Sequence, residues 1–407
     1  MANKKKTATM PKQSFPAVIV MAAGKGTRMK TDLPKVLHKV MGRTVISHVL
    51  NSVRYLSPER LIVVTGHGAE EVEAEIANSG AIFARQNEPR GTAHAVQAAM
   101  GALDGFGGSV VILSGDVPLI SPQTLLDLLD AHEVLGCPLS VLTVRLDDPA
   151  SYGRIIRDRY GWLEKIVEAR EATEEELLVD EINSGIYVVD SMELRETIFN
   201  IKPNNAQKEF YLTDLVKEIR SRGKLAGAVE GPEPLEVQGI NTCLELAAAQ
   251  AISRARINES WLLSGVIMED PATTYIEASV RLSSGVSLGQ GAILSGNSRV
   301  GQGVSVGHYC CLHDVEIEPG ATLRPHLSLS GSKVFSDGRV EPRPGLATLG
   351  QRPVPKSRGV KATKPAPKSR GVKAAKPAPK SRAVKAAKPA VKFNNGQNSQ
   401  NRGSTKF

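Results

Sequence analysis

A cluster of cations and small residues lies near the start of the chain. Its cations are Lys25, Arg28, Lys30 and Lys35, with Asp32 as the acid among them. Its small residues are Ala22, Ala23, Gly24 and Gly26, which leave backbone N–H groups open to a ligand. Amides and cations together are typical of a site that binds a polyphosphate. The alternative, a surface turn with solvated lysines, does not require both features.

The elements around this loop follow the pattern of an α/β fold. Apolar runs predict strands at 17–21, 61–65, 81–84 and 110–113. Helical periodicity falls at 45–55, 70–78, 93–100 and 125–132, the last preceded by Ser121 and Pro122 as a helix start. We therefore expect a parallel sheet with helices on both faces and ligands at the carboxyl ends of its strands.

Two further loops after strands carry polar groups. Asp116 follows the run 110–113, where a carboxylate is suited to hold a divalent metal against phosphate oxygens; an ordinary Gly-Asp turn is the alternative. Gln86 follows the run 81–84, and its amide offers both a donor and an acceptor to a nucleobase. Gly91 and Thr92 open the next helix, with Thr92 as a simple N-cap in the alternative reading. His94 is interpreted as a packed or capping residue, not a base.

Common glycine motifs do not fit the spacing of the first loop, which is neither a Walker A loop nor G-x-G-x-x-G. The loop resembles the G-x-G-T-R-M signature, followed by Pro-Lys, of nucleotidyltransferases that activate sugar phosphates. The matching residues are Gly24, Gly26, Thr27, Arg28, Met29, Pro34 and Lys35.

Over residues 17–262 the chain resembles the uridyltransferase domain of the bifunctional N-acetylglucosamine-1-phosphate uridyltransferase and glucosamine-1-phosphate acetyltransferase family. The segments that carry the resemblance beyond Asp116 include Ser151–Ile155, Ile166–Ala172, Glu181–Tyr187 and Gln238–Thr242. It implies uridylyl transfer from UTP to N-acetylglucosamine 1-phosphate, giving UDP-N-acetylglucosamine and pyrophosphate for cell-envelope precursor synthesis. It also implies Mg²⁺ as cofactor.

The resemblance implies a role for each matching residue. The uridine would be held by Ala22, Ala23, Gly24, Gln86, Gly91 and Thr92, with Gly115 as a further substrate-binding residue. Arg28 and Lys35 would bind the triphosphate, and Asp116 and Asn241 the magnesium. Gly153, Glu168 and Asn183 would contact the N-acetylglucosamine moiety. The chain departs from the family pattern at Ser114, where many relatives have Tyr, and at Lys208, where they usually have Gly.

A six-residue repeat follows the helical pattern that runs from Asn241 to Leu263. Its apolar anchors are Ile276, Leu282, Leu288, Leu294, Val300, Val306 and Leu312. This is the hexapeptide signature of a left-handed parallel β-helix. Three hexads per coil, as the resemblance implies, predict little more than two coils, roughly 11 Å long. Because the repeat stops near Leu312, we expect no acetyltransferase activity, so that another protein supplies the acetylated substrate.

Charge divides the chain unevenly. The net charge of the whole chain is +9. The segment Gln351–Phe407 holds 16 Lys and Arg and no acid. The residues before this segment therefore hold 51 − 16 = 35 cations and 42 acids, a net charge of −7. A twelve-residue repeat begins at Lys356, Lys368 and Lys380. Its low apolar content predicts a disordered tail, either a spacer or a segment that binds nucleic acid or another polyanion.

The remaining composition concerns compartment and partners. Cys137, Cys243, Cys310 and Cys311 form no C-x-x-C pair, and no apolar run is long enough for a membrane span, so we expect a cytoplasmic protein. A zinc site from His308, Cys310, Cys311 and His313 is the less favoured reading, because alternate residues of a coil point in opposite directions; we expect core thiols and surface imidazoles. The oligomeric state stays open, with a homotrimer through the short β-helix as one expectation.

The predicted fold class is α/β: a Rossmann-like nucleotidyltransferase domain with a mixed sheet, a short left-handed parallel β-helix and a disordered basic tail. The expected limits are a disordered N-terminus at 1–15, the nucleotidyltransferase domain at 16–240, a linker helix at 241–264, the β-helix at 265–335 and the tail at 336–407. Two rival functions remain: an enzyme for another sugar 1-phosphate with UTP or dTTP, and a non-catalytic sugar-nucleotide-binding protein.

Overall fold

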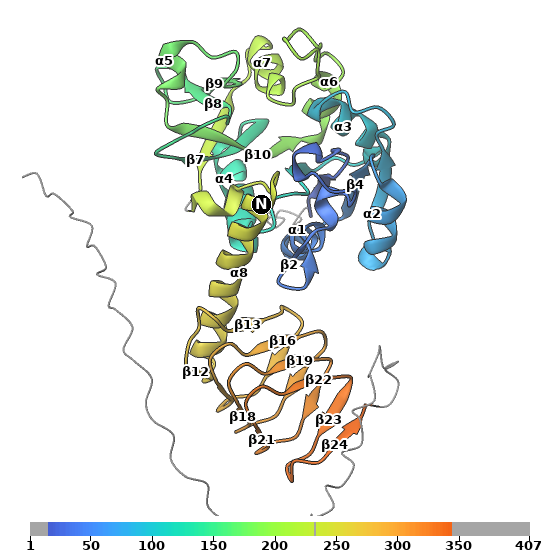
Figure 1. Ribbon diagram of the computed structural model, residues 1–407. Coiled ribbons are helices and arrows are strands. Elements are labelled where there is room, and N and C mark those ends of the chain that lie inside the picture. Colours follow the sequence, from blue (N-terminus) through green and yellow to red (C-terminus); the bar gives the residue numbers. More distant parts are fainter. Residues whose placement is uncertain (1–14, 232, 344–407) are drawn as a thin grey trace, which may run out of the picture. The chain divides into compact units, whose positions relative to one another are not determined.

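The computed structural model describes residues 15–343 except residue 232 (Figure 1). The twelve-residue repeats and most of the predicted disordered segments lie outside these residues. Of the predicted tail, residues 336–343 are described, and there β24 (Val340–Pro342) pairs antiparallel with β23 (Ser332–Val334). A disordered tail therefore does not begin at residue 336.

The large sheet combines parallel and antiparallel strands in the order β11-β7-β10-β6-β1-β4-β5. The central strand β1 pairs in parallel with β4 and β6, and β4 pairs in parallel with β5, as the alternating pattern predicts. The long strand β10 runs antiparallel to β6 and β7 and makes the sheet mixed. The bounds are β1 (Ala17–Met21), β4 (Arg60–Thr65), β5 (Ile82–Arg85), β6 (Ser109–Ser114), β7 (Leu139–Arg145), β8 (Arg154–Arg157), β9 (Leu163–Val167), β10 (Glu181–Asp190) and β11 (Ala226–Glu230).

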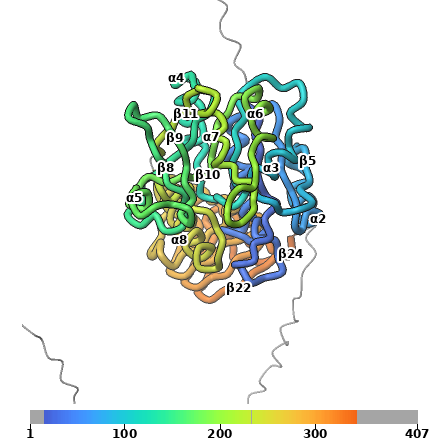
Figure 2. Tube along the Cα trace, turned by 90° about the horizontal axis from the view of Figure 1, so that it is seen from above, coloured from blue at the N-terminus to red at the C-terminus, as the bar shows by residue number. Residues whose placement is uncertain are grey.

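Helices cover both faces of this sheet because its buried strands alternate their side chains between two cores. On β1, Ala17 and Ile19 join one core and Val18 and Val20 join the other. The first core is covered by α3 (Thr92–Ala99), α6 (Ser191–Thr197) and α7 (Asp214–Ser221), of which α6 and α7 lie side by side (Figure 2). The second core is covered by α1 (Val45–Val53), α2 (Ala69–Glu75) and α4 (Pro122–Leu135).

Short elements complete this part of the chain. Ser121 caps α4 by accepting a hydrogen bond from the Thr124 amide, and Pro122 is its first residue, as expected. The remaining elements are the 3₁₀ turns η1 (Thr27–Met29), η2 (Lys35–Leu37), η3 (Arg54–Leu56), η4 (Ala77–Ser79), η5 (Met100–Leu103) and η6 (Pro234–Val237), the hairpin β2 (Lys39–Val40) and β3 (Arg43–Thr44), and helix α5 (Glu174–Leu177). Helix α8 (Cys243–Leu263) then leads to the β-helix.

The β-helix is longer than the hexads predict. Its short parallel strands stack four deep in each of three sheets, β12-β15-β18-β21, β13-β16-β19-β22 and β14-β17-β20-β23, and β24 extends the third. Four stacked strands span about 14 Å, so the expected limit of little more than two coils is wrong. The bounds are β12 (Ile267–Met268), β13 (Tyr275–Ile276), β14 (Arg281–Leu282), β15 (Ser287–Leu288), β16 (Ile293–Ser295), β17 (Arg299–Val300), β18 (Ser305–Val306), β19 (Cys311–His313), β20 (Glu316–Ile317), β21 (Thr322–Leu323) and β22 (Ser328–Ser330).

A one-residue deletion hides the last coils from the six-residue repeat. Leu294 pairs with Leu312, 18 positions later, whereas Val300 pairs with Ile317, only 17 positions later. The turn between Leu312 and Ile317 is shorter by one residue and contains Asp314 at a φ of 53°. Beyond it the apolar anchors continue as Ile317, Leu323 and Val334, all buried in the same core as the earlier ones.

Candidate active site

The loop after β1 is folded back on itself so that Lys35 faces the end of the strand. Gly26 has a φ of 59°, and a Cβ atom there would lie 2.7 Å from the Cβ of Lys35, so a larger residue would displace the lysine. Ala22 and Ala23 are buried, and the Ala22 amide donates to the Val64 carbonyl at 2.8 Å. A Cβ at Gly24 would meet no atom within 4 Å, which leaves its backbone open to a ligand.

The second loop, after β6, carries Asp116 to the same edge of the sheet. The Gly115 amide donates to the Met21 carbonyl at 2.8 Å, which joins the ends of β1 and β6. The Asp116 carbonyl accepts from the Ile240 amide at 2.9 Å. Two segments far apart in the sequence therefore converge where β1 lies between β4 and β6, the position at which parallel sheets bind ligands.

These segments assemble a compact group of charged and amide side chains. The Lys35 ammonium contacts Oδ2 of Asp116 and lies 3.1 Å from Oδ1 of Asn241. The Arg28 guanidinium donates to the same Asn241 oxygen at 3.0 Å. The side chains of Lys35 and Asp116 are 14% and 13% exposed, so their attraction is screened less than that of a surface pair.

Glu245 is a site residue that the sequence reasoning missed. Its carboxylate accepts hydrogen bonds from the backbone N–H groups of Asn241 at 2.6 Å and Thr242 at 2.8 Å. The backbone N–H of Glu245 in turn donates to the Thr242 hydroxyl. This is a capping box at the start of α8, and it fixes the backbone that presents Asn241. The signal was available as the T-x-x-E spacing of Thr242 and Glu245. The predicted helix start at Asn241 lies two residues before the first residue of α8.

The loop between β5 and α3 is tied to the segment that precedes α7. Gly91 has a φ of 114°, and a Cβ there would lie 2.5 Å from the Phe210 carbonyl oxygen. The Thr92 hydroxyl accepts from the Leu212 amide at 2.9 Å, and Gly91, not Thr92, holds the N-cap position of α3. The simple N-cap reading of Thr92 is therefore wrong. Thr92 instead connects two loops.

The buried Gln86 amide is held within its own loop. Its Nε2 donates to the Gly91 carbonyl at 3.1 Å and lies 2.9 Å from Nδ1 of His94. The His94 ring also lies 6.1 Å from the Phe210 ring, between centroids, so His94 is packed as expected. The helix start and the Gln86 side chain thus form one preorganised unit.

A third group brings the predicted sugar residues together. The backbone N–H of Asn183 donates to the Gly153 carbonyl at 2.9 Å. A Cβ atom at Gly153 would lie 3.1 Å from Cγ2 of Ile166, so a larger residue does not fit there without displacing Ile166. The Asn183 side chain donates to the Tyr187 hydroxyl at 2.9 Å and accepts from the Gly185 amide at 3.0 Å. Asn183 is therefore fixed at both ends of its amide.

Glu168 completes this third group. Its Oε1 accepts from the Thr213 hydroxyl at 3.3 Å, and burial raises the pKa of its carboxyl, with Glu171 and Asp214 adding repulsion. Burial also raises the pKa of Tyr187, to which the Glu168 charge contributes. The Tyr187 hydroxyl is thus hydrogen-bonded to Asn183 and influenced by the charge of Glu168.

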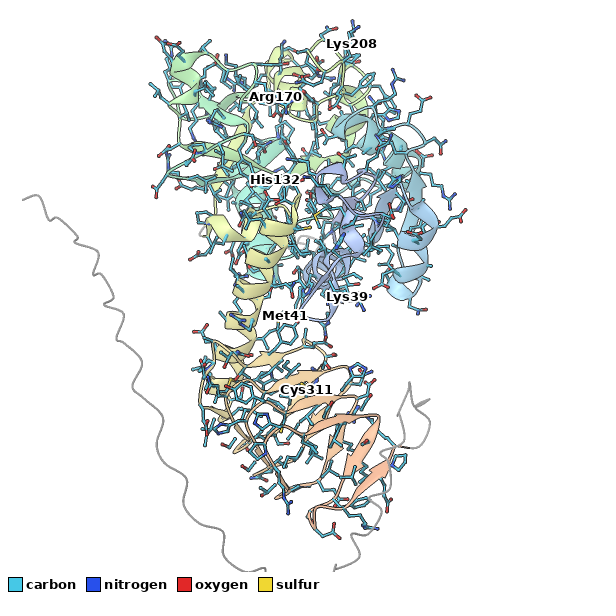
Figure 3. All side chains as sticks on the ribbon, in the orientation of Figure 1. Lys39, Met41, His132, Arg170, Lys208 and Cys311 are labelled. Atoms are coloured by element: carbon cyan, nitrogen blue, oxygen red, sulfur yellow. The ribbon has the colours of Figure 1, made fainter. Side chains whose placement is uncertain are left out.

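The donor set around Asp116 fits a hard divalent cation. One carboxylate and one amide oxygen converge on the Lys35 ammonium, and Mg²⁺ is usually bound by one or two carboxylates with waters and substrate phosphates. Within residues 15–343, no group of three or more His, Cys, Asp or Glu side chains has metal-binding geometry. The His and Cys side chains around His308 therefore do not form such a group. Cys310 is in the β-helix core but Cys311 is exposed (Figure 3), so the expectation of two core thiols is wrong for Cys311.

Comparison with known proteins agrees with this architecture. A family described as "MobA-like NTP transferase domain" matches residues 18–181, the part that contains the β1 and β6 loops. The bifunctional protein GlmU of Geobacillus sp. (strain WCH70) is 39% identical over 324 residues, covering 80% of this chain and 70% of that protein. GlmU of Geotalea uraniireducens (strain Rf4) is 38% identical over 334 residues, covering 81% and 73%.

One further relative and one solved structure complete the comparison. GlmU of Corynebacterium glutamicum (strain R) is 40% identical over 313 residues, covering 75% of this chain and 64% of that protein. A solved UDP-glucose pyrophosphorylase in complex with UDP-glucose superposes with a TM-score of 0.48 at 18% identity, over 60% of this chain and 99% of that one.

The fold and the convergence of Lys35, Asp116 and Asn241 define a nucleotidyltransferase, and the chain is an enzyme of that class. Within the class, it belongs to the family of bifunctional GlmU proteins. No helix in the described part of the chain has the length and apolarity that crossing a membrane requires.

Proposed function

We propose that the chain transfers a uridylyl group from UTP to N-acetylglucosamine 1-phosphate and releases pyrophosphate. The observation that carries this proposal is the Lys35 ammonium between Asp116 and Asn241, at the edge of the sheet where the backbone of Gly24 is open to a ligand. The group of Gly153, Glu168 and Asn183 supplies polar contacts for the sugar. Ala22, Ala23, Gly24, Gln86, Gly91, Gly115 and Thr92 are the proposed contacts for the nucleotide.

The proposed reaction is a direct displacement. A phosphate oxygen of the sugar 1-phosphate forms a bond to the α-phosphorus of UTP, and the bond from that phosphorus to the bridging oxygen breaks, so pyrophosphate leaves with the electron pair. The nucleophile is already an anion, so catalysis depends on positioning and charge neutralisation more than on a general base. Arg28 and Lys35 bind the phosphate oxygens and stabilise the charge that accumulates on them.

Asp116 and Asn241 are the proposed ligands of Mg²⁺, which supplies further neutralisation of phosphate charge when bound. Lys35 contacts the same two oxygen atoms. Triphosphate oxygens offer this ammonium new partners, so nucleotide binding would free both protein oxygens for the metal. Glu245 keeps Asn241 in position through its backbone amide.

The test is pyrophosphate release from a panel of nucleotides and sugar 1-phosphates. UTP with N-acetylglucosamine 1-phosphate is expected to give the highest kcat/KM. A clear preference for glucose 1-phosphate or for dTTP would favour the second candidate, an enzyme for another sugar 1-phosphate. Binding of the sugar nucleotide without turnover of any pair would favour a non-catalytic binding protein.

We also propose that this chain does not acetylate glucosamine 1-phosphate, and that another protein supplies the acetylated substrate. Parallel coils continue past Leu312, so the end of the six-residue repeat does not support this proposal. In the third sheet, β24 turns back antiparallel on β23 after four coils, which ends parallel stacking there. Acetyl-CoA-dependent acetylation at a rate comparable with uridylyl transfer would contradict this proposal.

The limits of the linker helix and of the β-helix remain a proposal that the elements support. Helix α8 falls within the proposed linker at 241–264, and β12 to β23 fall within the proposed β-helix at 265–335. We propose that the protein forms a homotrimer through the β-helix and that it lies in the cytoplasm. The mass of the protein in solution, measured by light scattering, tests the assembly.

The basic segment from Gln351 to Phe407 is proposed to bind a polyanion, because its 16 cations have no acid among them. If about eight of these cations engaged single-stranded nucleic acid, the log-log salt slope would be about −6. A truncation after Gly350 is expected to lose this binding and to keep uridylyl transfer. Equal nucleic-acid binding by both forms would remove the proposal.

A further inference from the structure

Arg154 is a buried cation for which no acidic partner lies within ion-pair distance in the described part of the chain. It is 3% exposed, and its Nε atom has no hydrogen-bond partner there. Arg157, on the same strand β8, shows the usual arrangement, because its guanidinium pairs with the buried carboxylate of Glu181. Burying a charge without a counter-ion is costly, so the position of Arg154 requires another explanation.

Three backbone carbonyls surround the Arg154 guanidinium. Nη1 donates to the Tyr152 carbonyl and to the Pro149 carbonyl at 3.4 Å, and Nη2 donates to the Ala150 carbonyl at 3.1 Å. All three belong to the loop that immediately precedes Arg154 in the sequence. The loop at 149–153 is therefore wound around a cation that neutralises the partial charges of its own carbonyls.

The loop conformation is one that the backbone does not adopt readily without support. Ala150 has a φ of 42°, in the left-handed region that disfavours residues other than glycine. The Ala150 amide donates to the Asp148 carboxylate at 3.1 Å, and the Tyr152 amide donates to the Pro149 carbonyl at 3.0 Å. The Arg154 guanidinium adds the contacts that hold the carbonyls in this arrangement.

The same loop is hydrogen-bonded to the proposed sugar group and packs on the second core. The carbonyl of its last residue, Gly153, accepts a hydrogen bond from the backbone N–H of Asn183 at 2.9 Å. The Asn183 side chain is proposed to bind the sugar. The Tyr152 side chain packs against the second core. Burial raises the pKa of its hydroxyl, with the Glu245 and Asp116 carboxylates adding to the shift and the Gly239 backbone opposing it. Movement of this loop would therefore disturb the sugar group, to which it is hydrogen-bonded.

We propose that Arg154 is a positioning residue that holds the loop at 149–153 in the conformation that binds the sugar 1-phosphate. The proposal rests on the proposed function, since it takes Gly153 and Asn183 to contact the sugar. A loop that is disordered before binding must be ordered by the substrate, which weakens binding. The loss should appear in the KM for the sugar phosphate and not in the KM for the nucleotide, because within the described residues the hydrogen bonds of the Arg154 side chain all go to its own loop.

The experiment compares Arg154→Met and Arg154→Lys with the control Arg157→Lys, which alters a charged contact on the same strand away from this loop. We expect Arg154→Met to raise the KM for N-acetylglucosamine 1-phosphate at least about tenfold and to leave the KM for UTP within about twofold. Arg154→Lys retains a cation for the carbonyls and should recover part of the loss. The control should keep both KM values.

Two results would overturn the proposal. One is a sugar KM unchanged in Arg154→Met despite a lower melting temperature, which would make Arg154 a structural residue only. The other is an equal rise of both KM values. If Arg154→Met does not fold, the same comparison is made with Arg154→Lys, in which a sugar KM raised alone supports the proposal and an unchanged sugar KM overturns it.

A measurement independent of turnover separates this proposal from the proposed function. Hydrogen exchange at the amides of Tyr152 and Asn183 should be faster in Arg154→Lys than in the unaltered protein, and unchanged in Arg157→Lys. If the unaltered protein transfers no nucleotide to any sugar 1-phosphate, the proposed function fails. Unchanged exchange at both amides overturns the role of Arg154 whatever the activity.

Discussion

The Lys35 ammonium contacts the Asp116 carboxylate although 81 positions separate the two residues in the sequence. Lys35 reaches this point because the loop after β1 turns back at Gly26, and Asp116 because it follows the neighbouring parallel strand β6. The pair brings the cation that we propose to bind phosphate into contact with the carboxylate that we propose to bind the metal.

Loss of either member of this pair is expected to reduce turnover strongly. Lys35→Ala and Asp116→Ala should each lower kcat at least about a hundredfold, because each removes charge stabilisation of the transition state. Pyrophosphate release under saturating substrate measures the effect, with Lys39→Ala as the matched control, since Lys39 is exposed on β2 (Figure 3). A loss of tenfold or less at both positions would count against the assigned roles.

Metal binding without nucleotide is expected to depend on Lys35 in the opposite direction. The ammonium occupies the space between Asp116 and Asn241 and repels a second cation. Lys35→Met should therefore bind Mn²⁺ at least about tenfold more tightly than the unaltered protein, as measured by electron paramagnetic resonance of free Mn²⁺. Lys39→Ala should bind as the unaltered protein does. Equal or weaker binding by Lys35→Met would show that the ammonium does not compete with the metal.

Glu168 is expected to make stability depend on pH. Burial raises its folded pKa above the ordinary value of 4.5, so the neutral form is favoured in the folded state. Its contribution to stability is complete below pH 4.5 and is lost as the pH rises through the folded pKa. The melting temperature of Glu168→Gln, relative to the unaltered protein, should therefore rise between about pH 4 and pH 7.

The control for this prediction is Glu164→Gln, because Glu164 is exposed on the adjacent strand β9. Its melting temperature should follow that of the unaltered protein over the same pH range. A difference between Glu168→Gln and the unaltered protein that stays constant with pH would contradict the assigned pKa shift.

Lys208 is expected to lower the free energy of unfolding relative to a glycine at the same position. Its φ of 55° lies in the left-handed region, and its amide donates to the Asn205 carbonyl in a turn. Lys208→Gly should raise the free energy of unfolding by about 1 kcal/mol, measured by urea denaturation. Lys202→Gly, at an exposed position that has no positive φ, should have no such benefit. Equal effects of the two substitutions would contradict the backbone argument.

The last coils of the β-helix are expected to contribute to its stability as much as the first. Leu323 is 3% exposed and belongs to the same core as Leu288. Leu323→Ala and Leu288→Ala should each lower the free energy of unfolding by about 2–5 kcal/mol, and Thr322→Ala, which changes an exposed neighbour, should have little effect. If Leu323→Ala behaved as Thr322→Ala does, the coils beyond Leu312 would not be part of the core.

Local patterns in the sequence determined much of the fold. The run at 17–21, the alternation of strands and helices to α4, and the six-residue anchors to Leu312 all predicted elements that the structure contains. Composition next to a strand also identified the loop with Gly26 and Lys35. These features are readable because burial on one or both faces imposes a period on neighbouring residues.

The tertiary structure decided what depends on residues distant in the sequence. It set β10 antiparallel between β6 and β7, joined Lys35 to Asp116 and Asn241, and surrounded Arg154 with the carbonyls of its own loop. A shortened turn after Leu312 interrupted the six-residue spacing by one residue, so the unbroken repeat ended there in the sequence while the coils continued in space. The spacing of apolar side chains indicates only which residues share a face. Backbone pairing between coils tolerates a shorter turn, provided that the next apolar anchor returns to the same core.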